Sequence, residues 1–194
     1  MINKPYHHGN LRNSLIENGI VLINQEGIKH FSLRKVAALC GTSHAAPYSH
    51  FQNKEELLKT MQDHVTEQIM EGLNNTIKSY PNPNDPYLLI QLGKFYVMFF
   101  IKNPHYFPFL FVQPGVEINL SMKEDETKNF PPFELFKTTA FPVLREIGIP
   151  EEKLKDSIIS MWATVHGLAS IATMKNVYYD EDWENKIEDI IWNK

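Results

Sequence analysis

The chain has 194 residues, of which 43% are hydrophobic and 22% charged, and its formal net charge is −4. This composition suits one or two soluble globular domains with a substantial core. The single cysteine, Cys40, excludes an internal disulfide, and no run of about 18 apolar residues could form a membrane helix. The first residues, MINKPYHHGN, lack the apolar centre of a signal peptide, so we expect a cytoplasmic protein.

Charge is unevenly distributed along the chain. Residues 1–60 contain seven basic and four acidic side chains, a net charge of +3, together with five of the eight histidines. The remaining residues contain 12 basic and 19 acidic side chains, a net charge of −7. A basic amino-terminal region on an acidic body suggests that this region alone meets a polyanion, although chance also produces a difference of this size.

Apolar residues at helical spacing predict an almost entirely helical chain, because alternating β-branched runs with Asn-Gly or Asp-Gly turns are missing. The first three helices are predicted over 11–26, 33–40 and 43–51. Ser32 and Ser43 are the expected caps of the second and third helices, because a serine hydroxyl can accept a hydrogen bond from a free backbone N–H there.

Three prolines in SYPNPNDP, residues 79–86, mark the clearest break in the chain. Before this break, a long fourth helix is predicted to begin after Asn53 and to reach about Lys78. After it, the pattern predicts helices over 87–102, 133–147, 150–176 and 182–192, a short phenylalanine-rich element between Pro104 and Pro108, and a loop over 114–132.

The tight connection CGTS joins the second and third helices, which form a helix-turn-helix pattern with the first helix behind them. Gly41 permits the sharp turn between them. In such a unit the second helix of the pair enters the DNA major groove, with its amino-terminal residues facing the base edges. The sequence therefore predicts a DNA-binding head.

Residues 32–58, SLRKVAALCGTSHAAPYSHFQNKEELL, resemble the DNA-binding domain of the TetR (tetracycline-repressor) family of bacterial transcription regulators. The shared pattern is a capped helix, a Gly-x-Ser turn, a short recognition helix ending in Tyr-x-x-Phe, and Lys-Glu-x-Leu at the start of the next helix. The resemblance is close over residues 1–60 and looser beyond them.

The fold expected from this resemblance is all-α, with a three-helix DNA-binding domain over residues 1–55 and a helical ligand-binding and dimerisation domain over 56–194. His44 can hydrogen-bond to a base edge or phosphate, and Ala45 can meet a thymine methyl. The positive end of the fourth helix can help Lys54 bind a phosphate. The residues expected at the DNA are Ser32, Arg34, Thr42, Ser43, His44, Ala45, Tyr48, Ser49, His50 and Lys54.

Several of these assignments have structural alternatives. Tyr48 and Phe51 stand at helical spacing and could both be core residues, and we expect burial for Phe51. His50 is equally well explained as a surface histidine. Lys54 could be solvated without touching DNA, and of the exposed Arg34 and Lys35 we expect one near the backbone of the duplex.

The acidic body is rich in aromatic residues between Phe95 and Phe111. Most of them suit a hydrophobic core, but an aromatic-lined cavity is also how helical proteins bind small apolar ligands. We expect a pocket for a small apolar or aromatic effector, with no metal and no other cofactor. The expected lining residues are Phe95, Phe99, Tyr106, Phe109, Trp162 and His166.

The segment WATVHGL, residues 162–168, resembles the Trp-x-x-x-His-Gly signature in the carboxy-terminal domain of one TetR subgroup. In this family the last two helices of each subunit build a four-helix dimer interface. Small residues at helical spacing also let another helix approach closely. The expected dimer residues are Ala163, Gly167, Ser170 and Met174. They could instead pack within one subunit, and His166 could be a packed histidine.

No HExxH motif, glycine-rich phosphate loop or cysteine cluster occurs, so we expect no enzyme, although a dispersed serine or aspartate nucleophile leaves no such motif. We expect a homodimeric transcription regulator that binds a near-palindromic operator, in the first instance a ligand-responsive repressor, with activation left open. The alternative is a helical small-molecule or protein-binding module that does not bind DNA. Salt-dependent binding to a duplex separates the two.

Overall fold

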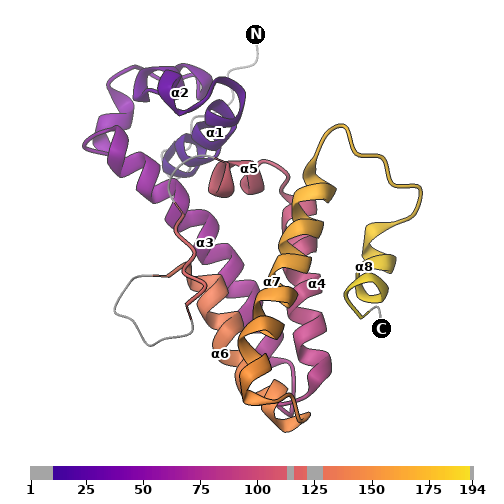
Figure 1. Cartoon of the computed structure of the whole chain (residues 1–194). Helices are drawn as coiled ribbons and strands as arrows, with labels where there is room; N and C mark the ends of the chain where they lie inside the picture. The colour runs from indigo at the N-terminus through magenta and orange to yellow at the C-terminus, as the bar shows by residue number, and fades with distance from the viewer. Residues whose placement is uncertain (1–10, 113–115, 122–128, 193–194) are drawn as a thin grey trace. The chain divides into compact units, whose positions relative to one another are not determined.

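The computed structural model of the chain describes residues 11–112, 116–121 and 129–192 (Figure 1). These residues form helices and no strands, which confirms the all-α prediction. The α-helices are α1 (Leu11–Glu26), α2 (Leu33–Leu39), α3 (Lys54–Lys78), α4 (Pro86–Lys102), α5 (Tyr106–Phe111), α6 (Pro131–Glu146), α7 (Glu151–Thr173) and α8 (Trp183–Trp192), with 3-10 helices η2 (Ile28–His30) and η3 (Ala46–Ser49).

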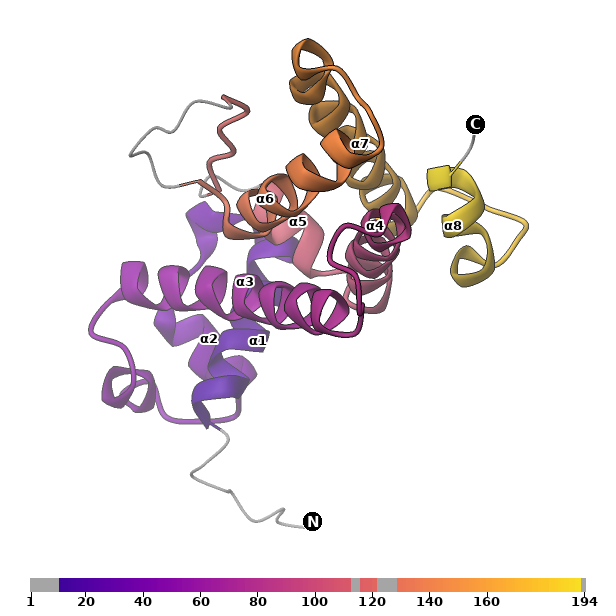
Figure 2. The ribbon, with the colours of Figure 1, turned by 90° about the horizontal axis from the view of Figure 1, so that it is seen from below.

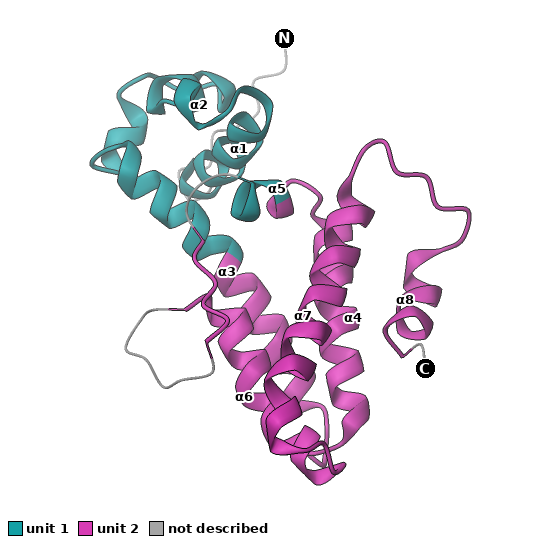
Figure 3. Cartoon of the chain, viewed as in Figure 1, with its two compact units in different colours: residues 1–65, 108–115 teal, residues 66–107, 116–194 magenta. Residues whose placement is uncertain are grey.

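The chain divides into two compact units (Figure 3). The first, here called the head unit, comprises residues 1–65 and 108–115, and the second, the body unit, comprises residues 66–107 and 116–194. The helix α3 begins in the head unit and ends in the body unit. Each unit has its own core.

The core of the head unit lies where α1, α2 and the first half of α3 bury their apolar faces. The side chains there with no exposed surface are Leu15, Ile16, Ile20 and Ile23 of α1, Val36 and Ala37 of α2, and Leu57, Met61 and Val65 of α3. Burying each large aliphatic side chain contributes about 1.5–3 kcal/mol. Gly19 leaves room for Met61, because a Cβ at Gly19 would lie 2.5 Å from the Met61 sulfur.

Two helix ends differ from the prediction by a few residues. The helix predicted over 133–147 begins at Pro131, because prolines fit the first turn, where no backbone N–H is needed. The helix predicted over 150–176 ends at Thr173, and Met174 is extended. Of the loop predicted over 114–132, residues 116–121 have no regular secondary structure. Positions 114–115 and 122–128 lie outside the described residues.

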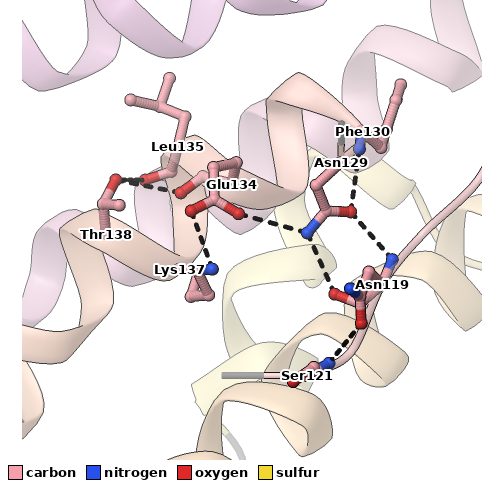
Figure 4. A network of polar contacts seen from close by, with 8 residues as sticks. All are labelled: Asn119, Ser121, Asn129, Phe130, Glu134, Leu135, Lys137 and Thr138. Carbon is pink, nitrogen blue, oxygen red and sulfur yellow. Dashed lines mark hydrogen bonds and ion pairs between the residues drawn. The ribbon is translucent and has the colours of Figure 1, made fainter. Parts of the chain in front are cut away.

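The segment before α6 is held by a small polar network around Asn129 (Figure 4). The Asn129 amide oxygen accepts the backbone N–H of Asn119 at 2.9 Å, and its amide nitrogen donates to the Asn119 carbonyl at 3.0 Å. The same nitrogen donates to Glu134 at 3.2 Å, and Glu134 pairs with Lys137 at 2.8 Å. These bonds fix the start of α6 against residues 116–121.

The helix α4 is the centre of the body unit, since it packs against α6, α7 and α8 (Figure 2). The α4 side chains of Leu88, Leu92 and Val97 are buried. Gly93 allows its neighbours to come close: a Cβ at Gly93 would lie 2.9 Å from Val165 of α7 and 3.1 Å from Ile191 of α8. A larger residue at this position would push α7 or α8 away.

Polar contacts add to this apolar docking of α8 on α4. The Glu188 carboxylate accepts hydrogen bonds from the Lys94 ammonium, at 2.5 Å, and from the Tyr87 hydroxyl. These two donors, Lys94 before Tyr87, lower the pKa of Glu188 from 4.5 to about 2. We call Tyr87, Lys94 and Glu188 the α8 clamp.

The α8 clamp makes stability depend on pH in a defined direction. A carboxyl whose pKa is lowered by folding contributes stability that is complete above its ordinary pKa and is lost as the pH falls toward the folded value. Glu188→Gln should therefore cost about 1–2 kcal/mol at about pH 7, and the cost should shrink by about pH 3.5. Urea unfolding at the two pH values measures this, with the exposed Glu184→Gln of the same helix as the control. An unchanged cost would contradict the prediction.

Candidate nucleic-acid interface and ligand cavity

The turn after α2 is built from backbone hydrogen bonds around a left-handed glycine. Gly41 has φ of 65°, and its N–H reaches the Ala38 carbonyl at 3.1 Å. The Thr42 N–H reaches the Ala37 carbonyl at 3.0 Å. This pair of bonds is a Schellman motif, which satisfies two carbonyls at the end of α2 and turns the chain sharply. Residues after Gly41 thereby leave the axis of α2.

The predicted recognition helix is shorter than expected and of another type. Instead of an α-helix capped by Ser43 and ending near Phe51, the chain forms the 3-10 helix η3, Ala46–Ser49. An α-helix starting after Ser43 needs the N–H of residue 47 to reach the Ser43 carbonyl, and Pro47 has none. The Ala46 N–H makes that bond instead, at 3.1 Å, which closes the tighter turn of a 3-10 helix.

Most residues predicted to meet DNA lie on the surface of the head unit. Ser43, His44, Ala45, Tyr48 and Ser49 are exposed, with Tyr48 at 56%, while Thr42 and His50 are half-buried. The Ser49 hydroxyl donates to the Ala46 carbonyl at 2.7 Å, so it also stabilises η3. The side chains of residues 42–50 thus form one exposed strip, here called the η3 surface, in which only Pro47 is buried.

The η3 surface is supported from behind by Phe51 and Lys54. Phe51 is 2% exposed, and the guanidinium carbon of Arg12 lies 5.6 Å from its ring centroid. The Lys54 ammonium donates to the Ile28 carbonyl at 2.9 Å and lies 5.6 Å from the Phe31 ring centroid. Lys54 therefore ties the start of α3 to the connection between α1 and α2, and two of its three N–H donors are left for a phosphate.

The start of α2 carries the other two predicted DNA contacts. The Ser32 hydroxyl accepts the Lys35 N–H at 3.3 Å, as expected of a cap. Arg34 is exposed, and no acidic side chain in the described part of the chain pairs with it, whereas Lys35 pairs with Glu26 at 2.6 Å. Of these two neighbouring cations, Arg34 is the one whose charge faces solvent without a partner of opposite sign.

Replacing Phe51 and Tyr48 in turn should distinguish the residue that stabilises the head unit from the residue that only lies on its surface. Phe51→Ala removes a buried ring and should cost about 3–5 kcal/mol of the free energy of unfolding. Tyr48→Ala removes a mostly exposed ring and should change it by less than about 1 kcal/mol. Urea unfolding followed by circular dichroism measures both, and equal costs would contradict the placement of these two rings.

Of the six residues predicted to line an effector pocket, one lines the body-unit cavity described below. Phe95 packs on Gly72, where a Cβ would lie 1.9 Å from the ring. The Phe99 ring lies 5.9 Å from that of Tyr106, and Phe109 is 3% exposed within the head unit. Trp162 alone among the six is a wall of the body-unit cavity described below.

His166 belongs to a packed aromatic cluster in the body unit. Its ring centroid lies 5.0 Å from that of Phe107 and 5.9 Å from that of Trp162. The Tyr96 hydroxyl and His166 Nδ1 are within hydrogen-bond distance, at 3.1 Å. Burial lowers the pKa of His166 and raises that of Tyr96 well above its ordinary value. Both groups are therefore neutral at ordinary pH.

The body unit contains a cavity of about 670 Å³. Its walls come from the end of α3, from α4, α6 and α7, and from the last turn of α8, and they include Leu89, Gly93, Tyr96 and Ile191, which were not predicted. Its volume is within the range of small-molecule sites. The one local signal for it was Gly93, a glycine inside an apolar helix, since such a residue marks a close approach of neighbours.

The predicted dimer residues lie along α7 in the body unit and, for Met174, directly after its end. Ala163 and Met174 are exposed, and Gly167 and Ser170 are half-buried. A Cβ at Gly167 would meet no atom within 4 Å, so open space lies in front of this glycine. Ile171, which lies between Ser170 and Met174 in the sequence, is 45% exposed. This strip of small and apolar side chains is here called the α7 face.

The described residues offer neither a metal centre nor a membrane span. No group of three or more histidine, cysteine, aspartate or glutamate side chains among them could hold a metal ion. No helix in this part of the chain combines the length and apolar character needed to cross a membrane.

The head unit has the helix-turn-helix architecture of DNA-binding regulators of transcription. Residues 15–61 match the family model of the bacterial regulatory proteins, tetR family. No curated protein sequence matches the chain. The family match identifies residues 15–61 as a TetR-type DNA-binding region.

Solved structures of such regulators share the fold over nearly the whole chain. A TetR-like transcriptional regulator from Rhodococcus sp. RHA1 has 14% identity and a TM-score of 0.66, covering 98% of this chain and 97% of its own. The TetR family regulator PfmR from Thermus thermophilus has 18% identity and a TM-score of 0.66, covering 91% and 96%. The fatty acid degradation regulator FadR from Bacillus halodurans has 11% identity and a TM-score of 0.63, covering 94% and 98%.

Proposed function

We propose that this regulator is a ligand-responsive repressor that acts in the cytoplasm and binds a near-palindromic operator as a homodimer. The observation that carries the proposal is the η3 surface, an exposed strip of hydrogen-bonding side chains presented by a rigid turn and supported by a buried ring. A two-fold dimer places two such surfaces on half-sites about one DNA turn apart.

The side chains of the η3 surface have the chemistry for reading bases. The hydroxyls of Thr42 and Ser43 and the imidazole of His44 can donate or accept hydrogen bonds at base edges. The Ala45 methyl can meet a thymine methyl, and its small size lets the backbone come close. Tyr48 would lie at the DNA with these residues, and Ser49 and His50 would follow at the edge of the groove.

Cations near this surface have the chemistry for phosphates. Arg34 presents an exposed guanidinium that can bind a phosphate with two parallel hydrogen bonds. Lys54 stands at the first turn of α3, where the helix dipole also favours an anion. These contacts position the head on DNA and make its affinity depend on salt, since each neutralised phosphate releases counterions.

His44→Ala should weaken binding to a duplex from the region upstream of the gene by about tenfold or more, because a base or phosphate contact is lost. Fluorescence anisotropy at several salt concentrations measures the affinity, which for the wild type should fall steeply with salt. His105→Ala is the matched control, because His105 is an exposed histidine of the body unit. Salt-independent or absent binding would instead favour a binding module that does not use DNA.

We also propose that the α7 face is the centre of the dimer interface. Its small residues at helical spacing and the open space in front of Gly167 fit a second helix at close range. Exposed apolar residues continue the strip toward the end of α7, with Met174 at 52% exposure. The last helix α8 would complete a four-helix interface with its partner.

Gly167→Leu should convert the dimer to a monomer, because the added side chain occupies the space that the partner helix needs. The matched control is Lys155→Leu, an exposed position on α7 roughly three turns before Gly167 and about a third of a turn around the helix axis from it. Light scattering after gel filtration gives the mass of each variant. A Gly167→Leu protein that stays dimeric would rule out this interface.

The segment WATVHGL supports a finer placement, in the TetR subgroup with a Trp-x-x-x-His-Gly signature in the carboxy-terminal domain. Trp162 and His166 lie on one side of α7 with their rings 5.9 Å apart, so both residues contribute to one aromatic cluster. This packing gives the spacing of the two residues a physical reason, because residues four apart on a helix are neighbours.

A further inference from the structure

The cavity of the body unit has no charged wall. None of its lining residues in the described part of the chain is an aspartate, glutamate, lysine, arginine or histidine. Most of them are aliphatic or aromatic, and the polar side-chain groups among them are the hydroxyls of Tyr96, Ser160 and Thr164 and the indole N–H groups of Trp162 and Trp192. The chemistry of these walls restricts what can bind.

The hydroxyls are themselves mostly engaged. The Thr164 hydroxyl donates to the Ser160 carbonyl at 2.9 Å, and the Tyr96 hydroxyl is 3.1 Å from His166 Nδ1. A carboxylate, phosphate or ammonium in this cavity would lose its hydration without gaining a partner of opposite charge, which is strongly unfavourable. An uncharged molecule with one hydrogen-bonding group avoids this cost.

The last turn of α8 forms one wall of the cavity, through Ile190, Ile191 and Trp192. Its position depends on two contacts with α4. Ile191 lies against Gly93, where a Cβ would come within 3.1 Å of its side chain. Glu188, one helical turn before this wall, is held by Lys94 at 2.5 Å and by Tyr87. The α8 clamp therefore fixes the wall from outside the cavity.

We infer that the cavity takes an uncharged, mostly hydrocarbon molecule, and that the last turn of α8, positioned by the α8 clamp, is the wall that retains it. The inference rests on the effector site of the proposed function and names the chemical class of its ligand. Glu188 acts here as a positioning residue, since its carboxylate orients α8 and does not line the cavity.

Matched pairs of neutral and charged probes test the ligand class. N-Phenyl-1-naphthylamine and 8-anilino-1-naphthalenesulfonate share a ring system and differ by one sulfonate. The neutral probe should bind one molecule per chain, quenching tryptophan fluorescence, and should bind at least about tenfold more tightly than the sulfonate. In competition, 1-decanol should displace it at least about tenfold better than decanoate. Equal binding by neutral and charged members of either pair would overturn the inference.

Variants test the wall. Glu188→Gln should raise the dissociation rate of N-phenyl-1-naphthylamine several-fold, and Glu184→Gln, an exposed carboxylate of the same helix, should not. The charge-swapped pair Lys94→Glu with Glu188→Lys should restore slow dissociation, because it reforms the ion pair between α4 and α8. A Glu188→Gln protein that retains the probe like the wild type would overturn the assignment of α8 as the retaining wall.

DNA binding is measured on the same wild-type protein. A failure of the cavity inference can then be told apart from a failure of the proposed function. A protein that binds its upstream duplex with steep salt dependence but binds none of the neutral probes retains the proposed function and loses this inference. A protein that binds the neutral probes selectively but binds no duplex keeps the cavity assignment and loses the proposed repressor.

Discussion

The exposed surface of the head depends on one backbone constraint, the left-handed conformation of Gly41. For a residue with a Cβ this conformation costs about 1–2 kcal/mol, and two hydrogen bonds to the last carbonyls of α2 form only when the chain turns there. After this turn Pro47 is buried and Phe51 packs into the core, so the polar residues between Thr42 and His50 face outward.

Much of the head could be predicted from the sequence because its signals are local. The first helix has the predicted bounds, since apolar periodicity and Gly27 mark its extent, and the Ser32 cap is present. The predicted helix type of the recognition segment is wrong, because that type depends on a missing donor, the N–H that Pro47 lacks. A proline in the first turn of an α-helix is a small loss, but here it decides which hydrogen bonds form.

The cavity could not be predicted in the same way. A cavity forms where side chains from several helices leave a space between them unfilled. The aromatic residues between Phe95 and Phe111 suggested a pocket by their number. Rings prefer edge-to-face contact with one another, and here they fill space around Tyr96 and His166. The cavity instead lies among aliphatic and aromatic side chains from α3, α4, α6, α7 and α8. Apart from Gly93, no single segment carries a signal for that arrangement.

Charge and packing together suggest how an occupant of the cavity could affect the proposed dimer. Met161, Thr164 and Val165 line the cavity, and Ala163 and Gly167 of the α7 face alternate with them along the same helix. A ligand changes an equilibrium only by its difference in affinity for the two states. A tenfold change needs about 1.4 kcal/mol, which is the burial of roughly 60 Å² more apolar surface in one state than in the other. A shift of α7 that moves one or two aliphatic side chains against the ligand is enough, and an uncharged hydrocarbon ligand can supply that difference through contact area alone.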